Sequence, residues 1–293
     1  MKINGSTKLY GIIGWPVKHS LSPTFQASFL EQQQINAVYL PFAVEPDMLP
    51  KAMEGLRALG VEGFNVTVPH KESVFRMVSP DGDAGIIGAV NTVRRTPGGW
   101  EATNTDWRGF VAVIDGLAVA VAGKSALLFG AGGTARAVLH ALAVLKLNSV
   151  YVCNRNPDRL AAFVEAGRRN YPDMDIHAVA WEQEAVTRAC GEAILLVNTT
   201  SLGLEPGQHF PFELGGEGVA IDAVYKPDGN TAFCRAAQPA RNSVDGLPML
   251  IAQGAESFAW WHGCARPALI GTLRNIEMSL GRDPLALPGW QAS

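Results

Sequence analysis

Short apolar runs alternate with stretches of helical periodicity along most of this chain. In the first hundred residues each apolar run is brief and bounded by turn residues, which predicts strands, and the stretches between have helical spacing. Pro23 favours a helix start, because proline suits the first helical position. The predicted strands are 9–13, 38–44, 63–68 and a hairpin of 90–95 with 100–104, and the predicted helices open at Ser22 and cover 49–59.

The pattern changes near Asp106. From there, strands alternate with helices across short Gly-rich turns, which is typical of parallel βαβ units in an open α/β sheet. The predicted strands are 125–129, 149–153, 193–197 and 219–221, and the predicted helices are 109–117, 134–145, 249–263 and 267–280.

Composition and charge narrow the function classes. The length of 293 residues suits two domains, and 47% of the residues are apolar, which is enough for a core. A net charge of −3 gives no electrostatic reason to expect nucleic-acid or membrane binding. No apolar stretch has the length of a membrane span, and residues 1–10 lack the apolar part of a secretory signal. We therefore expect a cytoplasmic protein.

The cysteines and histidines show no spacing typical of a metal site or of a disulfide framework. The four cysteines lie far apart in the sequence and form no CxxC motif, so reduced thiols are expected. We expect no bound metal.

A glycine-rich turn joins the strand 125–129 to the helix that follows. Its spacing, Gly130-x-Gly132-x-x-Ala135, fits the dinucleotide fingerprint with alanine at the third place. Gly130 permits the tight turn, Gly132 lets the backbone approach a pyrophosphate, and the start of the helix offers unpaired N–H groups. A purely structural turn is the alternative. The predicted nucleotide-binding residues are Gly130, Ala131, Gly132, Gly133 and Thr134.

The end of the next strand bears on the choice of cofactor. An NAD site typically has an acid there, whereas this chain has Asn154 and Arg155, with Arg159 four residues further. A guanidinium suits the adenosine 2′-phosphate, because its planar fork pairs with phosphate oxygens. The segment therefore favours NADP. Asp158 lies nearby and keeps NAD open, although a solvated loop acid is its simpler interpretation.

Two polar segments stand out in the first part, 65–71 and 104–106. On the residues alone, Lys71 is a surface lysine after a strand and Asp106 is a helix N-cap.

Nine short blocks, in order along the chain, resemble the shikimate dehydrogenase family. They are SLSP at 20–23, NVTVPHK at 65–71, GAVNT at 88–92, NTD at 104–106, GAGGT at 130–134, NRNPDR at 154–159, NTTSLG at 198–203, DAVY at 222–225 and DGLPMLIAQ at 245–253.

The resemblance implies a two-domain α/β fold. A substrate domain would consist of 1–105 plus 244–293, and a Rossmann-type NADP-binding domain of 106–243, with a cleft between them. It also implies reversible, NADPH-dependent reduction of 3-dehydroshikimate to shikimate, on the route to chorismate and the aromatic amino acids. In the family, the residues matching Lys71 and Asp106 form the catalytic pair; Lys71 would give or take the hydroxyl proton, and Asp106 would be its partner.

Further site residues follow from the same match. The implied substrate contacts are Ser20, Ser22, Thr67, Lys71, Asn91, Asp106, Tyr225 and Gln253. The implied cofactor contacts beyond the glycine turn are Asn154, Arg155, Arg159, Thr200, Ser201, Ala223 and Gly246.

The chain departs from the family pattern at three places near these residues. Trp107 stands where the family often has glycine, Asn156 where threonine is common, and Thr199 where alanine is common. Two other functions stay open: an NAD-dependent quinate/shikimate dehydrogenase, and a non-catalytic sensor of nucleotide and shikimate-like ligands. Retention of both Lys71 and Asp106 argues against a sensor. The expected partner is a small-molecule substrate, and the expected state is a monomer or a homodimer.

Overall fold

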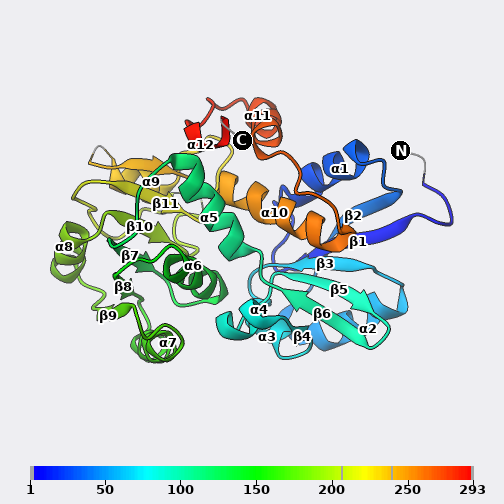
Figure 1. Ribbon diagram of the computed structural model, residues 1–293, viewed down its shortest axis with the longest axis horizontal. Helices are drawn as coiled ribbons and strands as arrows, with labels where there is room; N and C mark the ends of the chain where they lie inside the picture. Colours follow the sequence, from blue (N-terminus) through cyan, green and yellow to red (C-terminus); the bar gives the residue numbers. More distant parts are fainter. Residues whose placement is uncertain (1–2, 206, 239, 292–293) are drawn as a thin grey trace. The chain divides into compact units, whose positions relative to one another are not determined.

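The computed structural model describes residues 3–205, 207–238 and 240–291, and these divide into two compact units (Figure 1). The first unit contains Met1–Gly109 and Leu250–Thr272, and the second contains Phe110–Met249 and Leu273–Ser293. Residues 273–293, expected from the resemblance to lie with the first domain, belong to the second unit in this division. The assignment of substrate and cofactor to separate domains stays a prediction.

The first unit is built on a mixed six-stranded sheet with the order β2-β1-β3-β5-β6-β4. Strands β2, β1 and β3 are parallel, and β5 and β6 form an antiparallel hairpin beside β3. Its elements are β1 (Lys8–Gly14), α1 (Ser22–Gln32), β2 (Ala37–Ala43), the 3₁₀ turn η1 (Pro46–Met48), α2 (Leu49–Ala58), β3 (Gly63–Val66), α3 (Lys71–Phe75), β4 (Ser79–Pro80), α4 (Gly82–Ile87), β5 (Thr92–Thr96), β6 (Gly99–Thr103), the start of α5 (Asp106–Leu117) and most of α10 (Leu247–His262).

The second unit is built on a parallel six-stranded sheet with the order β12-β11-β10-β7-β8-β9. Read from β9, this is the doubly wound order 3-2-1-4-5-6. The side of the sheet on which successive strands are added changes between β7 and β10, and this is the switch point. Its elements are most of α5, then β7 (Ser125–Phe129), α6 (Gly133–Val144), β8 (Ser149–Cys153), α7 (Pro157–Asn170), β9 (Asp175–Val179), α8 (Gln183–Glu192), β10 (Leu195–Asn198), β11 (Val219–Asp222), α9 (Ala232–Ala237), β12 (Asn242–Val244), most of α11 (Leu269–Leu280) and α12 (Pro288–Gln291). The predicted α/β class with a Rossmann-type unit is confirmed.

Most predicted elements are present, with shifted ends. The strands 125–129 and 149–153 coincide with β7 and β8, because both are short, mostly apolar runs with sharp limits in the sequence. Strand β3 ends at Val66, two residues earlier than predicted, since Thr67–His70 closes as a turn with the His70 N–H 3.0 Å from the Thr67 carbonyl.

Each sheet has its own apolar core. In the first unit Phe64 packs edge-on against Trp100, with ring centroids 5.1 Å apart, within a cluster of residues from α2, β1, β3 and the hairpin. In the second unit Phe129 is fully buried and contacts the rings of Phe210, Phe212 and Phe233. The strands of both sheets are therefore packed against buried aromatic side chains.

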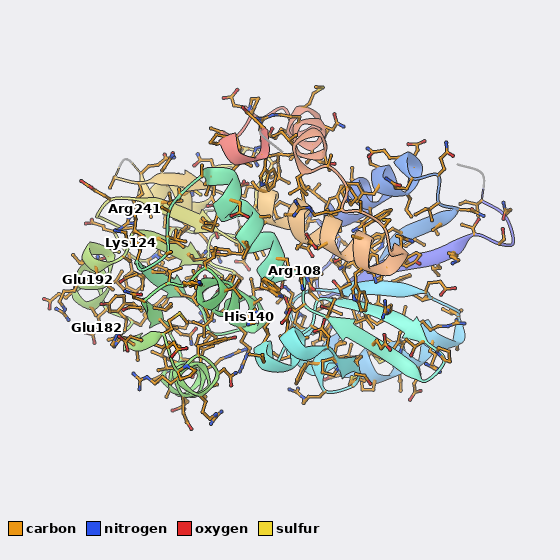
Figure 2. All side chains as sticks on the ribbon, in the orientation of Figure 1. Arg108, Lys124, His140, Glu182, Glu192 and Arg241 are labelled. Carbon is orange, nitrogen blue, oxygen red and sulfur yellow. The ribbon has the colours of Figure 1, made fainter. Side chains whose placement is uncertain are left out.

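A buried arginine binds several main-chain carbonyls in the second unit. Arg241, labelled in Figure 2, is 3% exposed, and burial lowers the pKa of its guanidinium. Among the described residues it donates to the main-chain carbonyls of Gly215, Ile194, Cys190 and Ala193, at 2.7–3.3 Å. Cys190 lies near the C-terminus of α8, where a cation is favourable.

We expect Arg241→Met to lower the free energy of unfolding by about 3 kcal/mol, because buried carbonyls lose their donors. Urea denaturation followed by circular dichroism measures this. Arg169→Met is the matched control: the Arg169 side chain is 69% exposed in an i,i+4 pair with Glu165, and such a pair is worth less than about 0.5 kcal/mol. Equal losses in the two variants would contradict the role of Arg241.

Helix α10 packs on the first sheet through aromatic rings. His262 at its end lies 4.5 Å from Phe258 and 5.1 Å from Tyr10, measured between ring centroids. Burial, and next the charge of Lys8, lower the pKa of His262 from 6.5 to about 4. Between these two pH values the imidazole of His262 is therefore neutral in the folded protein and protonated in the unfolded chain.

The sign of the pH effect follows from linkage. His262 supports the fold fully above its unfolded pKa of 6.5, and that support is lost as the pH falls toward about 4. As the pH falls from 6.5 to about 4, we expect the melting temperature of His262→Phe to drop by less than that of the wild type. Thermal melts across that range test this, with the exposed His209→Gln as control. A slope equal to that of the wild type would rule out His262 as the source.

Candidate active site

An ion pair lies where two strands of the first sheet end. Lys71 opens α3 after β3, and Asp106 opens α5 after β6. Lys71 Nζ is 2.6 Å from Asp106 Oδ2, and the two side chains are only 11% and 6% exposed. An ion pair at this depth is screened by solvent and salt less than a surface pair, so the attraction between its two groups is stronger.

Asn91 holds the other oxygen of the same carboxylate. The Thr105 N–H, which can only donate, lies 2.7 Å from Asn91 Oδ1, and this fixes which way the side-chain amide points. Asn91 Nδ2 therefore faces Asp106 Oδ1 at 2.8 Å and Gln253 Oε1 at 3.0 Å. Four predicted site residues, Lys71, Asn91, Asp106 and Gln253, are thus joined by direct hydrogen bonds.

Behind these residues lies a layer of buried polar groups that the sequence interpretation did not assign to the site. Asn65 Nδ2 lies within hydrogen-bonding distance of the Asn91 carbonyl, Thr92 Oγ1 and Ser257 Oγ. Tyr39 donates to Asn65 Oδ1 at 2.7 Å. One signal was available: Ser257 follows Gln253 by one helical turn, so both side chains lie on the same face of α10.

Of the two serines predicted to contact the substrate, Ser22 joins this layer. Ser22 opens α1, and its N–H lies 3.3 Å from Ser20 Oγ. The Ser22 hydroxyl bonds to Tyr39, whose pKa burial raises well above its usual value. Thr67 is connected through the turn that leads to Lys71. Contacts with substrate stay predictions for all of these residues. The remaining predicted contact, Tyr225, lies in the second unit.

The glycine turn lies at the switch point of the second sheet. Gly130 follows β7 with φ +114°, a conformation that favours glycine, and a Cβ there would meet Thr199 Oγ1 after β10. Gly132 is the N-cap of α6, and its position leaves the first N–H groups of that helix directed at the turn. Helix N-termini of this kind can bind a phosphate, and phosphate binding by residues 130–134 stays a prediction.

One of the two predicted arginines after β8, Arg159, lies beside this turn. A Cβ on Gly132 would be 3.8 Å from an Arg159 guanidinium nitrogen, so Arg159 reaches the glycines. Asn156 caps α7 by accepting from the Arg159 N–H at 2.9 Å. Asp158 is exposed in the first turn of α7, where an acid suits the helix dipole. Binding of a 2′-phosphate by Arg155 and Arg159 stays a prediction.

The other predicted cofactor residues follow neighbouring strands of the same sheet. Thr200 and Ser201 come after β10, and Ala223 after β11. The Gly246 N–H donates to the Val224 carbonyl at 2.9 Å, and a Cβ on Gly246 would strike the Ala223 carbonyl. All these segments therefore lie at the carboxyl ends of parallel strands, where ligands of open α/β sheets bind.

A buried carboxylate joins two of these segments. Asn198 Nδ2 donates to Asp222 Oδ1 at 2.8 Å, while Asn198 Oδ1 accepts from the Thr200 N–H and hydroxyl at 3.0 and 2.7 Å. Burial raises the pKa of Asp222 to about 7, against hydrogen bonds from Thr231, Val224 and Asn198 that lower it. The sequence interpretation did not assign Asn198 or Asp222 to the site, although both lie in its matched blocks.

Several predicted absences concern the described residues alone. Within them, no cluster of His, Cys, Asp and Glu is arranged to hold a metal, and no helix is both long and apolar enough to cross a bilayer.

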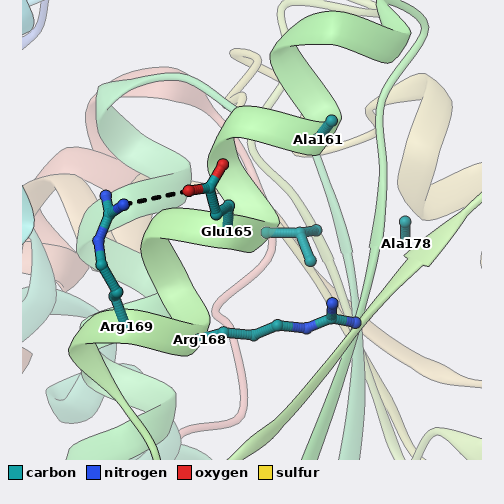
Figure 3. Close-up of a pocket in the computed structure, with 6 residues that line it drawn as sticks. Ala161, Glu165, Arg168, Arg169 and Ala178 are labelled. Carbon is teal, nitrogen blue, oxygen red and sulfur yellow. Dashed lines mark hydrogen bonds and ion pairs between the residues drawn. The ribbon is translucent and has the colours of Figure 1, made fainter.

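A groove beside α7 and β9, shown in Figure 3, is lined by residues outside the predicted site. Its lining residues are Ala161, Val164, Glu165, Arg168, Arg169 and Ala178.

Known proteins share both the sequence and this architecture. The family profile described as the shikimate dehydrogenase substrate binding domain matches residues 12–93. The shikimate dehydrogenase (NADP(+)) of Thermosynechococcus vestitus is 37% identical over 290 residues, covering 96% of this chain and 99% of its own. This chain belongs to the shikimate dehydrogenase family.

Solved structures of the family agree with the fold. The enzyme of Aquifex aeolicus has a TM-score of 0.82 at 37% identity and covers 96% of this chain and 100% of its own. The Thermus thermophilus enzyme, in complex with NADP(H) and shikimate, has a TM-score of 0.80 at 34% identity, covering 94% of this chain and 100% of its own.

The three departures from the shikimate dehydrogenase pattern have local explanations. Asn156 replaces the common threonine yet still supplies the cap of α7. Thr199 donates its hydroxyl to the Phe129 carbonyl at 2.7 Å, which ties β10 to the end of β7. The Arg108 guanidinium covers the Trp107 ring at 4.4 Å.

We expect the double variant Arg155→Ala/Arg159→Ala to bind NADP about tenfold to a hundredfold more weakly, because two charged partners of a 2′-phosphate are lost. Titration of nucleotide by calorimetry measures this. NAD, which has no 2′-phosphate, is the matched ligand and should bind the variant as it binds the wild type. An unchanged NADP affinity would remove both arginines from the phosphate site.

Proposed function

We propose that this chain is an NADP-dependent shikimate dehydrogenase that interconverts 3-dehydroshikimate and shikimate. The observation that carries the proposal is the buried Lys71–Asp106 pair, held by Asn91 and Gln253 among hydroxyl and amide groups. Such a surrounding suits a small substrate with several hydroxyls better than an apolar one. The family relationship adds the identity of the substrate and of the cofactor.

The second unit would hold the cofactor with residues 130–134 around the pyrophosphate. Arg155 and Arg159 would take the 2′-phosphate, and the segments after β10, β11 and β12 would lie beside the nicotinamide. The bound cofactor supplies the hydride in one direction and accepts it in the other. The protein is left with binding, orientation and the proton.

Lys71 would be the proton donor and acceptor at the C3 oxygen. In reduction, its ammonium group gives a proton to the oxygen as the carbonyl carbon receives the hydride. In oxidation, the neutral amine takes the hydroxyl proton as the hydride leaves. Asp106, held at both oxygens, would keep Nζ in place and accept a hydrogen bond from a substrate hydroxyl.

The remaining predicted contacts would complete substrate recognition. Ser20 and Ser22, at the start of α1, would bind the carboxylate, and Thr67, Asn91, Gln253 and Tyr225 the hydroxyls. We place the enzyme in the cytoplasm on the route to chorismate and the aromatic amino acids. The serine pair favours shikimate over quinate.

The experiment that tests the proposal is an initial-rate assay of shikimate and quinate, each with NADP and with NAD. Reduction of NADP by shikimate in preference to the other three combinations is expected. Turnover with quinate and NAD would instead support a quinate/shikimate dehydrogenase. Nucleotide and shikimate binding by calorimetry without turnover would support a sensor.

We expect Lys71→Ala to lower kcat by at least about a hundredfold, the usual worth of general acid–base catalysis. Steady-state rates of NADPH formation from shikimate measure this. Lys51→Ala, which removes an exposed lysine on α2, is the control and should leave kcat unchanged. A Lys71→Ala enzyme that keeps most of its turnover would remove Lys71 from the proton transfer.

A further inference from the structure

We propose that Ser257 is a positioning residue for the reaction, fixing Gln253 against Asn91 and Asn91 against Asp106 through a buried cluster of hydroxyls. The inference rests on the proposed function, which it deepens. Ser257 lies on α10, is fully buried, and has no direct contact with Lys71 or Asp106 among the hydrogen bonds of the described residues.

The Ser257 hydroxyl is surrounded by more partners than it can use at one time. Its Oγ lies 2.9 Å from Asn65 Nδ2, 2.7 Å from Thr92 Oγ1 and 3.0 Å from Thr105 Oγ1. It also lies 3.0 Å from the Gln253 carbonyl one turn earlier in α10. A hydroxyl makes one donated and two accepted bonds, so every bonding position of Ser257 is filled.

These contacts join α10 to three separate parts of the first unit. Asn65 belongs to β3, Thr92 opens β5, and Thr105 lies between β6 and α5. A serine that only tolerated burial would need a single partner, its own helix carbonyl. Ser257 instead lies where three strand ends meet.

One consequence concerns Gln253. Because Gln253 and Ser257 are four residues apart, the anchor at Ser257 fixes the rotation of the helix at Gln253. Gln253 Nε2 bonds to the Leu250 carbonyl at 2.8 Å, which leaves Oε1 toward Asn91 at 3.0 Å. A turn of α10 would withdraw this acceptor from Asn91.

The second consequence concerns Asp106. The Thr105 hydroxyl that meets Ser257 belongs to the residue whose N–H fixes the Asn91 amide. Asn91 in turn donates to Asp106 Oδ1. Paths through Thr105, Thr92 and Gln253 therefore lead from this one hydroxyl to Asn91, and Asn91 connects them to Asp106.

The test removes only the hydroxyl, in Ser257→Ala, and assays the full-length enzyme. We expect kcat/KM for shikimate to fall about tenfold to a hundredfold, because small misplacements of catalytic groups cost rates of this size. The loss should appear in both kcat and the KM for shikimate, while the KM for NADP stays that of the wild type. Combining Ser257→Ala with Thr105→Val should cost less than the product of the two separate losses.

Thr272→Val is the matched control. Thr272 is also a buried helical hydroxyl bonded to the carbonyl four residues earlier, at 3.0 Å, and its hydrogen bond lies outside the cluster. Its loss should lower the melting temperature without changing kcat or either KM. A Ser257→Ala enzyme that behaves in the same way would overturn the proposal and leave Ser257 a purely structural residue.

A readout independent of turnover separates this inference from the proposed function. Hydrogen exchange of the peptide containing Thr105 reports the bond from its N–H to Asn91. We expect faster exchange in Ser257→Ala and wild-type exchange in Thr272→Val; unchanged exchange in Ser257→Ala would overturn the positioning role. Absence of wild-type turnover with shikimate would refute the proposed function, while the exchange experiment would still decide the inference.

Discussion

The side-chain amide of Asn91 is the group on which the first unit's polar arrangement depends. Its oxygen is fixed by the Thr105 N–H, so its nitrogen faces the oxygens of Asp106, Gln253 and the Thr105 hydroxyl. If the amide turned over, an oxygen would face the carboxylate and a nitrogen the N–H, and both would be unfavourable. One main-chain hydrogen bond to Asn91 thus determines which of its amide atoms faces the Asp106 carboxylate.

The second unit solves a related problem with backbone geometry. Its parallel strands bring residues far apart in sequence to one edge, where Gly130 and Thr199 face each other across the switch point. Few side chains are then needed at this turn, because the free N–H groups at the start of α6 already supply hydrogen-bond donors there. Asn198 and Asp222 perform the joining role there that Asn91 performs in the first unit.

The sequence pattern predicted those elements whose limits depend on neighbouring residues alone. Strands β7 and β8 were found to the residue because apolar runs have clear ends, and the glycine turn because its spacing is set by the backbone. Helices α7 and α8 and strand β9 were missed, since their exposed faces break the apolar pattern. Lys71 and Asp106 are 35 residues apart, and Ser257 is 152 from Thr105, so only the fold, or the family resemblance, could bring them together.

The cap of α7 couples two properties that are usually treated as separate. Asn156 Oδ1 receives the N–H of Arg159 itself, so the acceptor that starts the helix also orients the residue assigned to the 2′-phosphate. Anyone redesigning residues 154–159 to exchange one nicotinamide cofactor for the other therefore inherits a constraint. Serine or threonine at 156 keeps the cap, and aspartate keeps it while adding a negative charge beside the arginines. Alanine removes the cap. A less stable α7 and a changed cofactor preference would then appear in the same variant, and the two effects could not be told apart.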